Sequence, residues 1–336
     1  MTPNIITEMN RVVYDVEKKI TFDERKVPEI YHYTSPEGLD GILFNERVSP
    51  CFRFSRFDVL NDKSEGCDIL DVYGRVVKQL FDEKKISKEF YEDVKEVSFN
   101  DRYVFAYNTG KTREIGTGRE VDDILLDSKK GKVYLCCFSK NKDSLPMWNY
   151  YLKNETYLGY NIGIITSFFE TEKNKSHKDG YLLDWFEVVY DEEEKEKILT
   201  ELILGLFGVY INLKDEHDKK YVKDRVVSFV NKYRFIFKRE CFRHEEEIRI
   251  ILIIPDGKFE EAQEQKVFEV YYRNVKNYIV PYILYENIPK FSVQRITIGP
   301  MEDKTDIQKK RKEVLEEKML SGDYHVGHAE QLLFSI

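Results

Sequence analysis

The stretch Glu-Ile-Arg-Ile-Ile-Leu-Ile-Ile, residues 247–254, decides the fold class. It is rich in isoleucine and contains no glycine or proline, which predicts a strand inside a sheet. A second dense apolar run, residues 133–138, predicts a buried central strand. Around these two strands, helical and strand-like segments follow each other without regular βαβ alternation. The sequence therefore predicts an α+β fold with a mixed, mostly antiparallel sheet.

Shorter patterns suggest how this fold is organised. Ser35 is placed to cap a helix that begins at Pro36, and a second helix is expected from Ser64 to about Lys84. Residues 191–238 are strongly helical in pattern, and we expect two helices that separate near Asn212 and form an insertion in the same domain. Further strands are expected at 30–34, 160–168, 185–190, 267–272, 278–282 and 293–298. We expect residues 1–28 to be a polar lead-in, 100–131 an irregular excursion, 303–320 a charged helix and 330–334 a last strand, with one domain spanning 29–336.

The composition limits the classes of function. The chain has 53 Lys and Arg against 61 Asp and Glu, a formal net charge of −8, which argues against non-specific coating of nucleic acid. The five cysteines include no CxxC pair, so neither a disulfide framework nor a zinc site is indicated. The first 25 residues lack an apolar signal-peptide core, and the longest apolar stretch, 198–213, is interrupted by Glu201. We expect a cytoplasmic protein without a membrane segment.

Several well-known catalytic motifs are absent from the sequence. It contains no GxGxxG, no GxxxxGK[ST], no HExxH and no GxSxG, so a Rossmann dinucleotide site and kinase, P-loop and zincin functions are not indicated. Among the six histidines, only His325-x-x-His328 has a metal-ligand spacing, and glycine-containing turn sequence surrounds it. We therefore predict no metal site.

Three segments combine polar side chains with flanking strand patterns. The first is Tyr31-His32-Tyr33-Thr34-Ser35, followed by Gly38-Leu39-x-Gly41-Ile42-Leu43; the second is Cys137-Phe138-Ser139 with Leu145-Pro146-Met147-Trp148-x-Tyr150-Tyr151 and Gly159-Tyr160-x-Ile162-Gly163; the third is Phe242-x-x-Glu245-x-Glu247-Ile248-Arg249. Two weaker segments are Phe54-Ser55 with Asn61-Asp62 and Glu65, and Ile296-Thr297-Ile298-Gly299-Pro300. In this order, from about residue 29 to 300, they resemble a bacterial family of unknown function, the domain-of-unknown-function family 2971.

A further resemblance is to the ADP-ribosyltransferase fold, which implies a split sheet. Members of that fold place a histidine or arginine on the first strand, a serine or aromatic residue near a middle strand, and a glutamate at the start of a later strand. His32, then Ser139 or the tyrosines Tyr150 and Tyr151, and finally Glu247 resemble these three positions, and Glu245 resembles the E-x-E variant. The long spacing between the second and third segments departs from the pattern, because the helical insertion lies between them.

The resemblance implies NAD as a substrate, and each residue type suits its part of the chemistry. Cleavage of the nicotinamide–ribose bond builds positive charge on the ribose, which a carboxylate such as Glu247 stabilises. Glu245 would orient or deprotonate the acceptor, and His32 would hold a ribose hydroxyl. A tyrosine would stack on the cationic nicotinamide ring. The residues we expect to bind NAD are His32, Tyr33, Thr34, Arg53, Ser55, Ser139, Trp148, Tyr150, Tyr151 and Arg249, the arginines as partners of phosphate.

Other functions and ordinary structural roles stay open from the sequence. On one strand, Glu245, Glu247 and Arg249 would share a face that lines a polar cleft or meets water at a sheet edge. His32 would also fit a half-buried strand position, and Trp148 a core position. The resemblance suggests a toxin or phage-defence effector that modifies nucleic acid or protein, with a protein partner or a homodimer. A non-catalytic nucleotide- or nucleic-acid-binding sensor and a metal-dependent nuclease are the alternatives.

Overall fold

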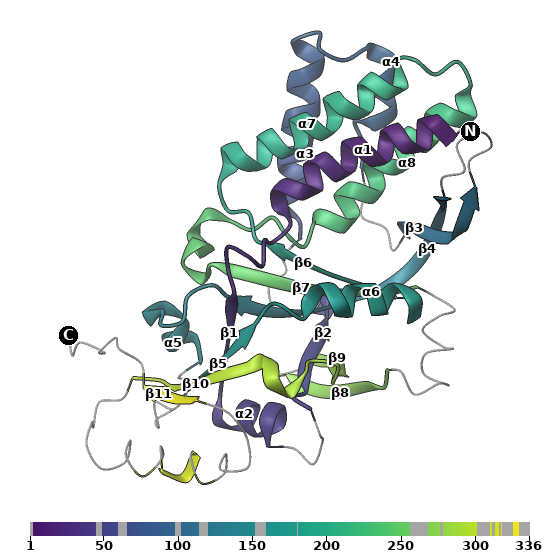
Figure 1. Cartoon of the computed structure of the whole chain (residues 1–336). Helices are drawn as coiled ribbons and strands as arrows, with labels where there is room; N and C mark the ends of the chain where they lie inside the picture. Colours follow the sequence, from purple (N-terminus) through teal and green to yellow (C-terminus); the bar gives the residue numbers. More distant parts are fainter. Residues whose placement is uncertain are drawn as a thin grey trace.

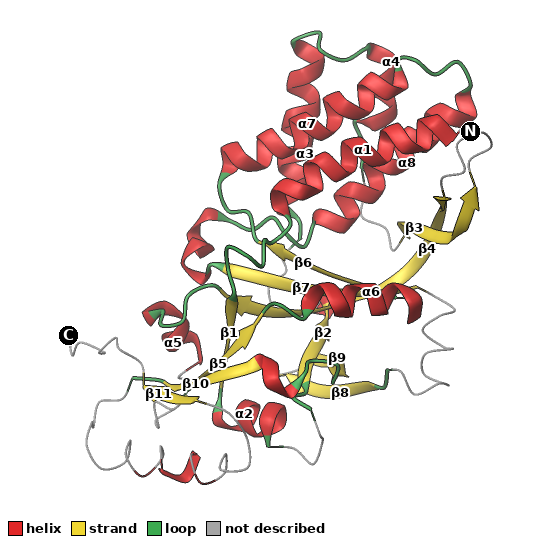
Figure 2. Ribbon diagram, viewed as in Figure 1, coloured by secondary structure: helices red, strands yellow, loops and turns green. Residues whose placement is uncertain are grey.

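The structure, a computed structural model, confirms the α+β class (Figures 1 and 2). It describes residues 3–44, 49–59, 66–97, 102–113, 120–151, 159–179, 181–255, 268–275, 278–300, 310, 313–315, 317 and 325–328. Within these ranges, eleven strands join in one sheet, in which all pairs are antiparallel except β10 with β11. Of the expected second helix, residues 64 and 65 lie outside the described residues, and 66 and 67 belong to no helix or strand. Most of the expected tail helix at 303–320 and the expected strand at 330–334 also lie outside the described residues.

A long central strand, β4 (Glu120–Ser139), organises the sheet. Its second half pairs with β7 (Glu247–Pro255) over residues 131–139, and β7 pairs in turn with β6 (Leu182–Glu187). The prediction of strands at the two apolar runs, 133–138 and 247–254, is therefore confirmed. The first half of β4 pairs with β3 (Arg102–Arg113) in a hairpin, where we expected an irregular excursion.

Two further groups of strands meet the other edge of β4. One group consists of β1 (Glu29–Thr34), β5 (Tyr160–Ile165), β10 (Val293–Ile298) and β11 (His325–His328), and the other of β2 (Phe52–Arg56), β9 (Tyr278–Tyr285) and β8 (Val270–Val275). β1 joins β4 at the pair Tyr31–Ser139, and β2 joins it at Ser55–Leu135 and Arg56–Tyr134. Because β7 occupies the opposite edge of β4, β1 and β2 share one edge and diverge beside residues 136–138.

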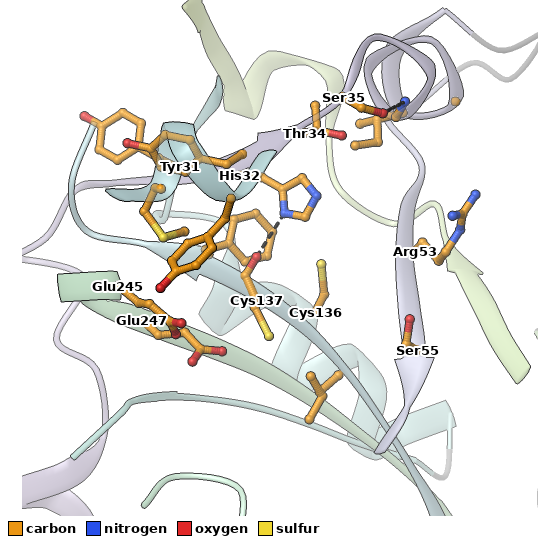
Figure 3. Close-up of a pocket in the computed structure, with 18 of the residues that line it drawn as sticks. Tyr31, His32, Thr34, Ser35, Arg53, Ser55, Cys136, Cys137, Glu245 and Glu247 are labelled. Carbon is orange, nitrogen blue, oxygen red and sulfur yellow. Dashed lines mark hydrogen bonds between the residues drawn. The ribbon is translucent and has the colours of Figure 1, made fainter. Parts of the chain in front are cut away.

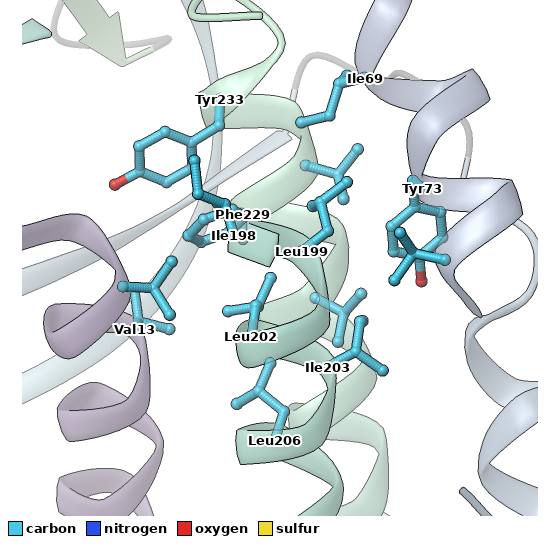
Figure 4. Close-up of a cluster of buried hydrophobic side chains, with 14 of the residues drawn as sticks. Val13, Ile69, Tyr73, Ile198, Leu199, Leu202, Ile203, Leu206, Phe229 and Tyr233 are labelled. Atoms are coloured by element: carbon cyan, nitrogen blue, oxygen red, sulfur yellow. The ribbon is translucent and has the colours of Figure 1, made fainter. Parts of the chain in front are cut away.

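Five helices form a layer on one face of the β4–β7–β6 region (Figure 1). They are α1 (Pro3–Ile20), α3 (Asp68–Asp82), α4 (Lys88–Val94), α7 (Glu192–Tyr210) and α8 (Glu216–Tyr233). The centre of the layer is α7, whose Leu202 and Leu206 are fully buried between α1 and α3 (Figure 4). Thus the segment 191–238 forms the two expected helices, whereas residues 3–20 form a buried amphipathic helix in place of the expected polar lead-in.

The opposite face of the sheet carries a second hydrophobic core, over which α6 (Phe169–Asp179) lies. Phe169 of α6 stacks on Trp185 of β6, with ring centroids 4.8 Å apart. Two short helices border the diverging strands: α2 (Pro36–Leu43), which follows β1, and α5 (Leu145–Tyr151), which follows β4. In the described part of the chain, no helix combines the length and the hydropathy needed to cross a membrane.

Candidate functional site

A cavity of about 840 Å³ opens where β1 and β2 diverge from β4 (Figure 3). Its wall is built from β1, the start of α2, β2, the end of β4, α5 and the segment that leads into β7. Residues from distant parts of the chain therefore meet here. Of the residues that the sequence proposed, those that line the cavity are His32, Tyr33, Thr34, Arg53, Ser55, Tyr150, Glu245 and Glu247.

The cavity connects both faces of the sheet. Ser55 of β2 pairs with Leu135 of β4, and β4 pairs with β7. This pairing places Ser55, Leu135 and Glu247 on the same face of the sheet. His32 points to the opposite face, where its ring lies 5.2 Å from that of Phe138. Ser55, Leu135 and Glu247 on one face and His32 on the other line the same cavity. The cavity therefore passes through the gap between β1 and β2.

His32 lies in this gap and its imidazole is held in one tautomer. Nδ1 lies 2.9 Å from the carbonyl oxygen of Cys137, which accepts only, so Nδ1 carries the proton and donates it (Figure 3). Burial beside Phe52 and Phe138 lowers the pKa of His32 from 6.5 to about 4, although the bond to the carbonyl opposes this. The imidazole is therefore neutral at pH 7, and its Nε2 is an acceptor with no partner among the described residues.

Glu247 forms the centre of a buried ion-pair cluster. Its Oε1 and Oε2 accept from Nε and Nη2 of Arg249 at 2.8 and 3.0 Å, and Oε2 also lies 3.0 Å from Nζ of Lys238. Burial by itself raises the pKa of Glu247, but Arg249 and Lys238 outweigh it and lower the pKa to about 2. The carboxylate is thus ionised at the cavity wall, with its charge shared by two cations.

Glu245 belongs to the same cluster, although it does not lie on the strand that carries Glu247. It ends a short 3-10 helix (Glu240–Glu245), and β7 begins only at Glu247. Between them Glu246 adopts φ +44°, the left-handed region that costs a non-glycine residue about 1–3 kcal/mol. This turn brings both carboxylates onto Lys238. Burial raises the pKa of Glu245, and the nearby Glu247 charge adds to the rise against the opposing effect of Lys238.

Two arginines line the cavity from the β2–β9–β8 side. Arg53 lies 4.6 Å above the ring of Tyr282, and Nη2 of Arg273 lies 3.4 Å from Oγ of Ser55. The sequence proposed Arg53 and Ser55, but it gave no signal for Arg273, an isolated arginine in β8. Ser55 and Arg273 are 218 positions apart, and only the sheet order brings them together.

An aromatic wall closes the side next to α5. Tyr33 is anchored there, because its hydroxyl donates to the carbonyl of Asn141 at 2.8 Å and accepts from the amide of Ser144 at 2.9 Å. Tyr150 is 44% exposed and its hydroxyl lies 3.1 Å from Nε2 of His244. Of the two tyrosines considered for stacking, Tyr150 is thus accessible at the cavity, and the side chain of Tyr151 lies outside what the structure describes.

Three other proposed residues whose side chains the structure describes do not line the cavity: Ser139, Trp148 and Arg249. Ser139 is fully buried and donates to the carbonyl of Glu245 at 2.8 Å, so it supports the turn before β7. Trp148 is fully buried behind Tyr33, with its Nε1 on Asp143 at 2.7 Å. Arg249 is fully buried and bound to Glu247 and to the carbonyl of Phe235, so it is not available for phosphate.

The remaining proposed residues lie outside what the structure describes. This holds for Asn61, Asp62 and Glu65, and for the side chains of Tyr151, His325 and His328. Among the side chains that are described, no three His, Cys, Asp or Glu residues gather at metal-binding spacing.

Comparison with known proteins adds no relative. No family model matches the chain, and neither a curated protein nor a solved structure matches it.

Proposed function

We propose that this chain is an NAD-consuming enzyme of the ADP-ribosyltransferase type, which transfers ADP-ribose to a macromolecule or hydrolyses NAD. The main support is that one cavity of about 840 Å³ is lined by His32, Tyr150 and the Glu245–Glu247 pair, in the order that the resemblance implies. Small-molecule sites typically enclose about 300–1,000 Å³. The divergence of β1 and β2 from β4 is compatible with the split sheet of that fold, and the proposal includes membership of family 2971.

The two carboxylates suit different steps. When the nicotinamide–ribose bond breaks, its electron pair leaves with nicotinamide and positive charge develops on the ribose. Glu247 stays ionised over the whole physiological range and would stabilise that charge. Glu245, whose pKa is raised, is the better base for the proton that the acceptor loses as it bonds to the ribose carbon.

His32 and Tyr150 would hold the substrate for this reaction. The Nε2 acceptor of His32 fits a ribose hydroxyl, and the exposed ring of Tyr150 offers a face to the cationic nicotinamide. We propose that the enzyme acts in the cytoplasm as a toxin or phage-defence effector on a nucleic acid or protein acceptor, with a protein partner or as a homodimer.

The test is release of nicotinamide from NAD by the purified chain, with RNA, DNA and protein offered as acceptors. Glu247→Gln should reduce the rate by about 100-fold or more, the usual effect of removing one group that stabilises transition-state charge. Asp184→Asn is the matched control. Asp184 is also a buried carboxylate on this sheet and is held by Lys173 and Lys232, but it does not line the cavity. Wild-type release no faster than that of Glu247→Gln would contradict the proposal.

A non-catalytic nucleotide sensor is the second candidate, and the ion pairs of Glu247 favour it. A carboxylate already neutralised by Arg249 and Lys238 has less charge to offer to a transition state. This candidate predicts thermal stabilisation by nucleotide without nicotinamide release. The metal-dependent nuclease stays a hypothesis that an EDTA arm tests, since ADP-ribosyl transfer should survive chelation.

A further inference from the structure

The side of the cavity formed by β2, β9 and β8 carries two arginines, Arg53 and Arg273, that have no carboxylate partner among the described residues. Arg53 extends from β2, and Arg273 from β8, both to the face of the sheet on which Ser55 lies. Among the described residues, neither guanidinium contacts a carboxylate: Arg53 lies on the ring of Tyr282, and Arg273 lies beside the Ser55 hydroxyl. Nε of Arg273 is buried without a hydrogen-bond partner. Two guanidinium groups of like charge therefore lie at the cavity wall, and Nε of Arg273 is a donor without an acceptor among the described residues.

The other charges of the cavity do not offset this pair. Lys238 is taken up by Glu245 and Glu247, and Glu247 is also bound by the buried Arg249. Glu37, the remaining acid of the wall, is exposed at the start of α2, and no ion pair joins it to either arginine. In the part of the chain that the structure describes, the cavity thus has a neutral ion-pair cluster at one end and two guanidinium groups without a carboxylate partner at the other.

The arginine end is also preorganised. The ring of Tyr282 supports the Arg53 guanidinium, and Tyr271 stacks behind Tyr282 with ring centroids 5.6 Å apart. Ser55 is buried in a paired strand, which fixes its hydroxyl beside Arg273. Guanidinium groups present several N–H donors in a planar fork that matches phosphate oxygens.

We propose that Arg53, Arg273 and Ser55 form an anion subsite that binds the diphosphate of a nucleoside diphosphate. Two adjacent phosphates carry the two negative charges that the guanidinium pair lacks, and their oxygens accept from the free donors. The identification of the diphosphate as part of NAD rests on the proposed function, whereas the subsite itself does not. Figure 3 shows His32, Arg53 and the two glutamates around the cavity that all of them line, so a dinucleotide with its phosphates at Arg53 would share this cavity with His32 and the glutamates.

Calorimetric titration of the full chain with ADP, AMP and adenosine tests this subsite. We expect ADP to bind more tightly than AMP, and AMP more tightly than adenosine. Arg53→Gln and Arg273→Gln should each weaken ADP binding by about tenfold or more, the usual effect of losing a charged hydrogen bond, and leave adenosine binding unchanged. Arg273→Lys should recover part of the loss. Arg56→Gln is the matched control, because Arg56 lies on the same strand and pairs with Asp58 away from the cavity wall.

The outcomes separate the subsite from the proposed reaction. Arginine-dependent ADP binding without nicotinamide release supports the subsite and contradicts the reaction. Nicotinamide release with the same KM in Arg273→Gln as in the wild type overturns the subsite and leaves the reaction standing. Equal binding of ADP and adenosine, or loss of ADP binding in Arg56→Gln to the same extent, also overturns the subsite. A 5′-phosphorylated oligonucleotide that binds more tightly than ADP would assign the arginines to nucleic acid instead.

Discussion

Replacement of Glu247 by glutamine should destabilise the folded chain at pH 7 by about 3 kcal/mol. Glutamine has the shape of the protonated acid, so its cost follows from the pKa of Glu247. That pKa falls from 4.5 to about 2 on folding, and a difference of about 2.5, at about 1.36 kcal/mol for each pKa unit, gives about 3 kcal/mol. The loss of one partner from a buried ion pair, about 3–5 kcal/mol, agrees, because Arg249 would be left buried without a carboxylate.

The difference in stability between wild type and Glu247→Gln should also depend on pH. A carboxyl whose pKa is lowered by folding stabilises the protein above about pH 4.5, and this contribution is lost as the pH falls toward 2. By pH 3 the wild type should have lost about 2 kcal/mol of it. The gap between wild type and Glu247→Gln should therefore shrink to about 1 kcal/mol at pH 3.

Urea unfolding, followed by the fluorescence of the buried Trp148 and Trp185, measures both quantities. Glu240→Gln serves as the control, because Glu240 pairs with Arg243 at the surface, where an ion pair contributes about 0–1 kcal/mol. A gap of less than about 1 kcal/mol at pH 7, or a gap of equal size at pH 3, would refute the reasoning and show that Glu247 is not the carboxylate of a buried ion pair.

Three other outcomes are expected. Asp184→Asn should lower the free energy of unfolding by about 3 kcal/mol, the lower end of the range for a broken buried pair, because it removes the carboxylate that Lys173 and Lys232 hold, while ADP affinity measured by calorimetry stays unchanged. The imidazole of His32 should titrate near pH 4 by NMR, and since its pKa lies below the ordinary 6.5, the protein should lose stability as the pH falls from 6.5 toward 4; titration near 6.5 would contradict its burial. Gly38→Ala places a Cβ 1.9 Å from Oγ1 of Thr34 and should cost about 1–3 kcal/mol, and the double variant with Thr34→Ala should recover most of this loss in thermal melts.

The strands and capped helices of the fold are readable from the sequence where one local signal dominates. The strand at 293–298 and the helix that Ser35 caps are found where they were expected, because apolar density and cap chemistry act within a few residues. The sequence predicts a polar lead-in at residues 1–28 because charged side chains dominate that segment, whereas residues 3–20 form a helix. The apolar stripe by which this helix packs has only four buried residues, at helical spacing: Met9, Val13, Val16 and Ile20.

The candidate site was readable in part for the same physical reason. His32, Glu245 and Glu247 stand in short polar segments beside strands, and they do line one cavity. Alternation along a strand places Arg249 on the face of Glu247 but does not show what covers that face, so the sequence predicts Arg249 as a phosphate partner, whereas the structure buries it in an ion pair with Glu247. Arg273 was missed because its role depends on the order of β2, β9 and β8, which no local pattern encodes.

The bond between His32 and the Cys137 carbonyl also determines what the cavity rejects. Since the backbone fixes the tautomer, a change of side chain at position 137 would leave the lone pair of Nε2 facing the ligand. A group that meets this nitrogen has to supply a hydrogen, so a hydroxyl is accepted, whereas a fluorine at the same place would set lone pairs against each other. The protein would thus discriminate against a fluoro analogue of a hydroxyl ligand, although the two differ little in size.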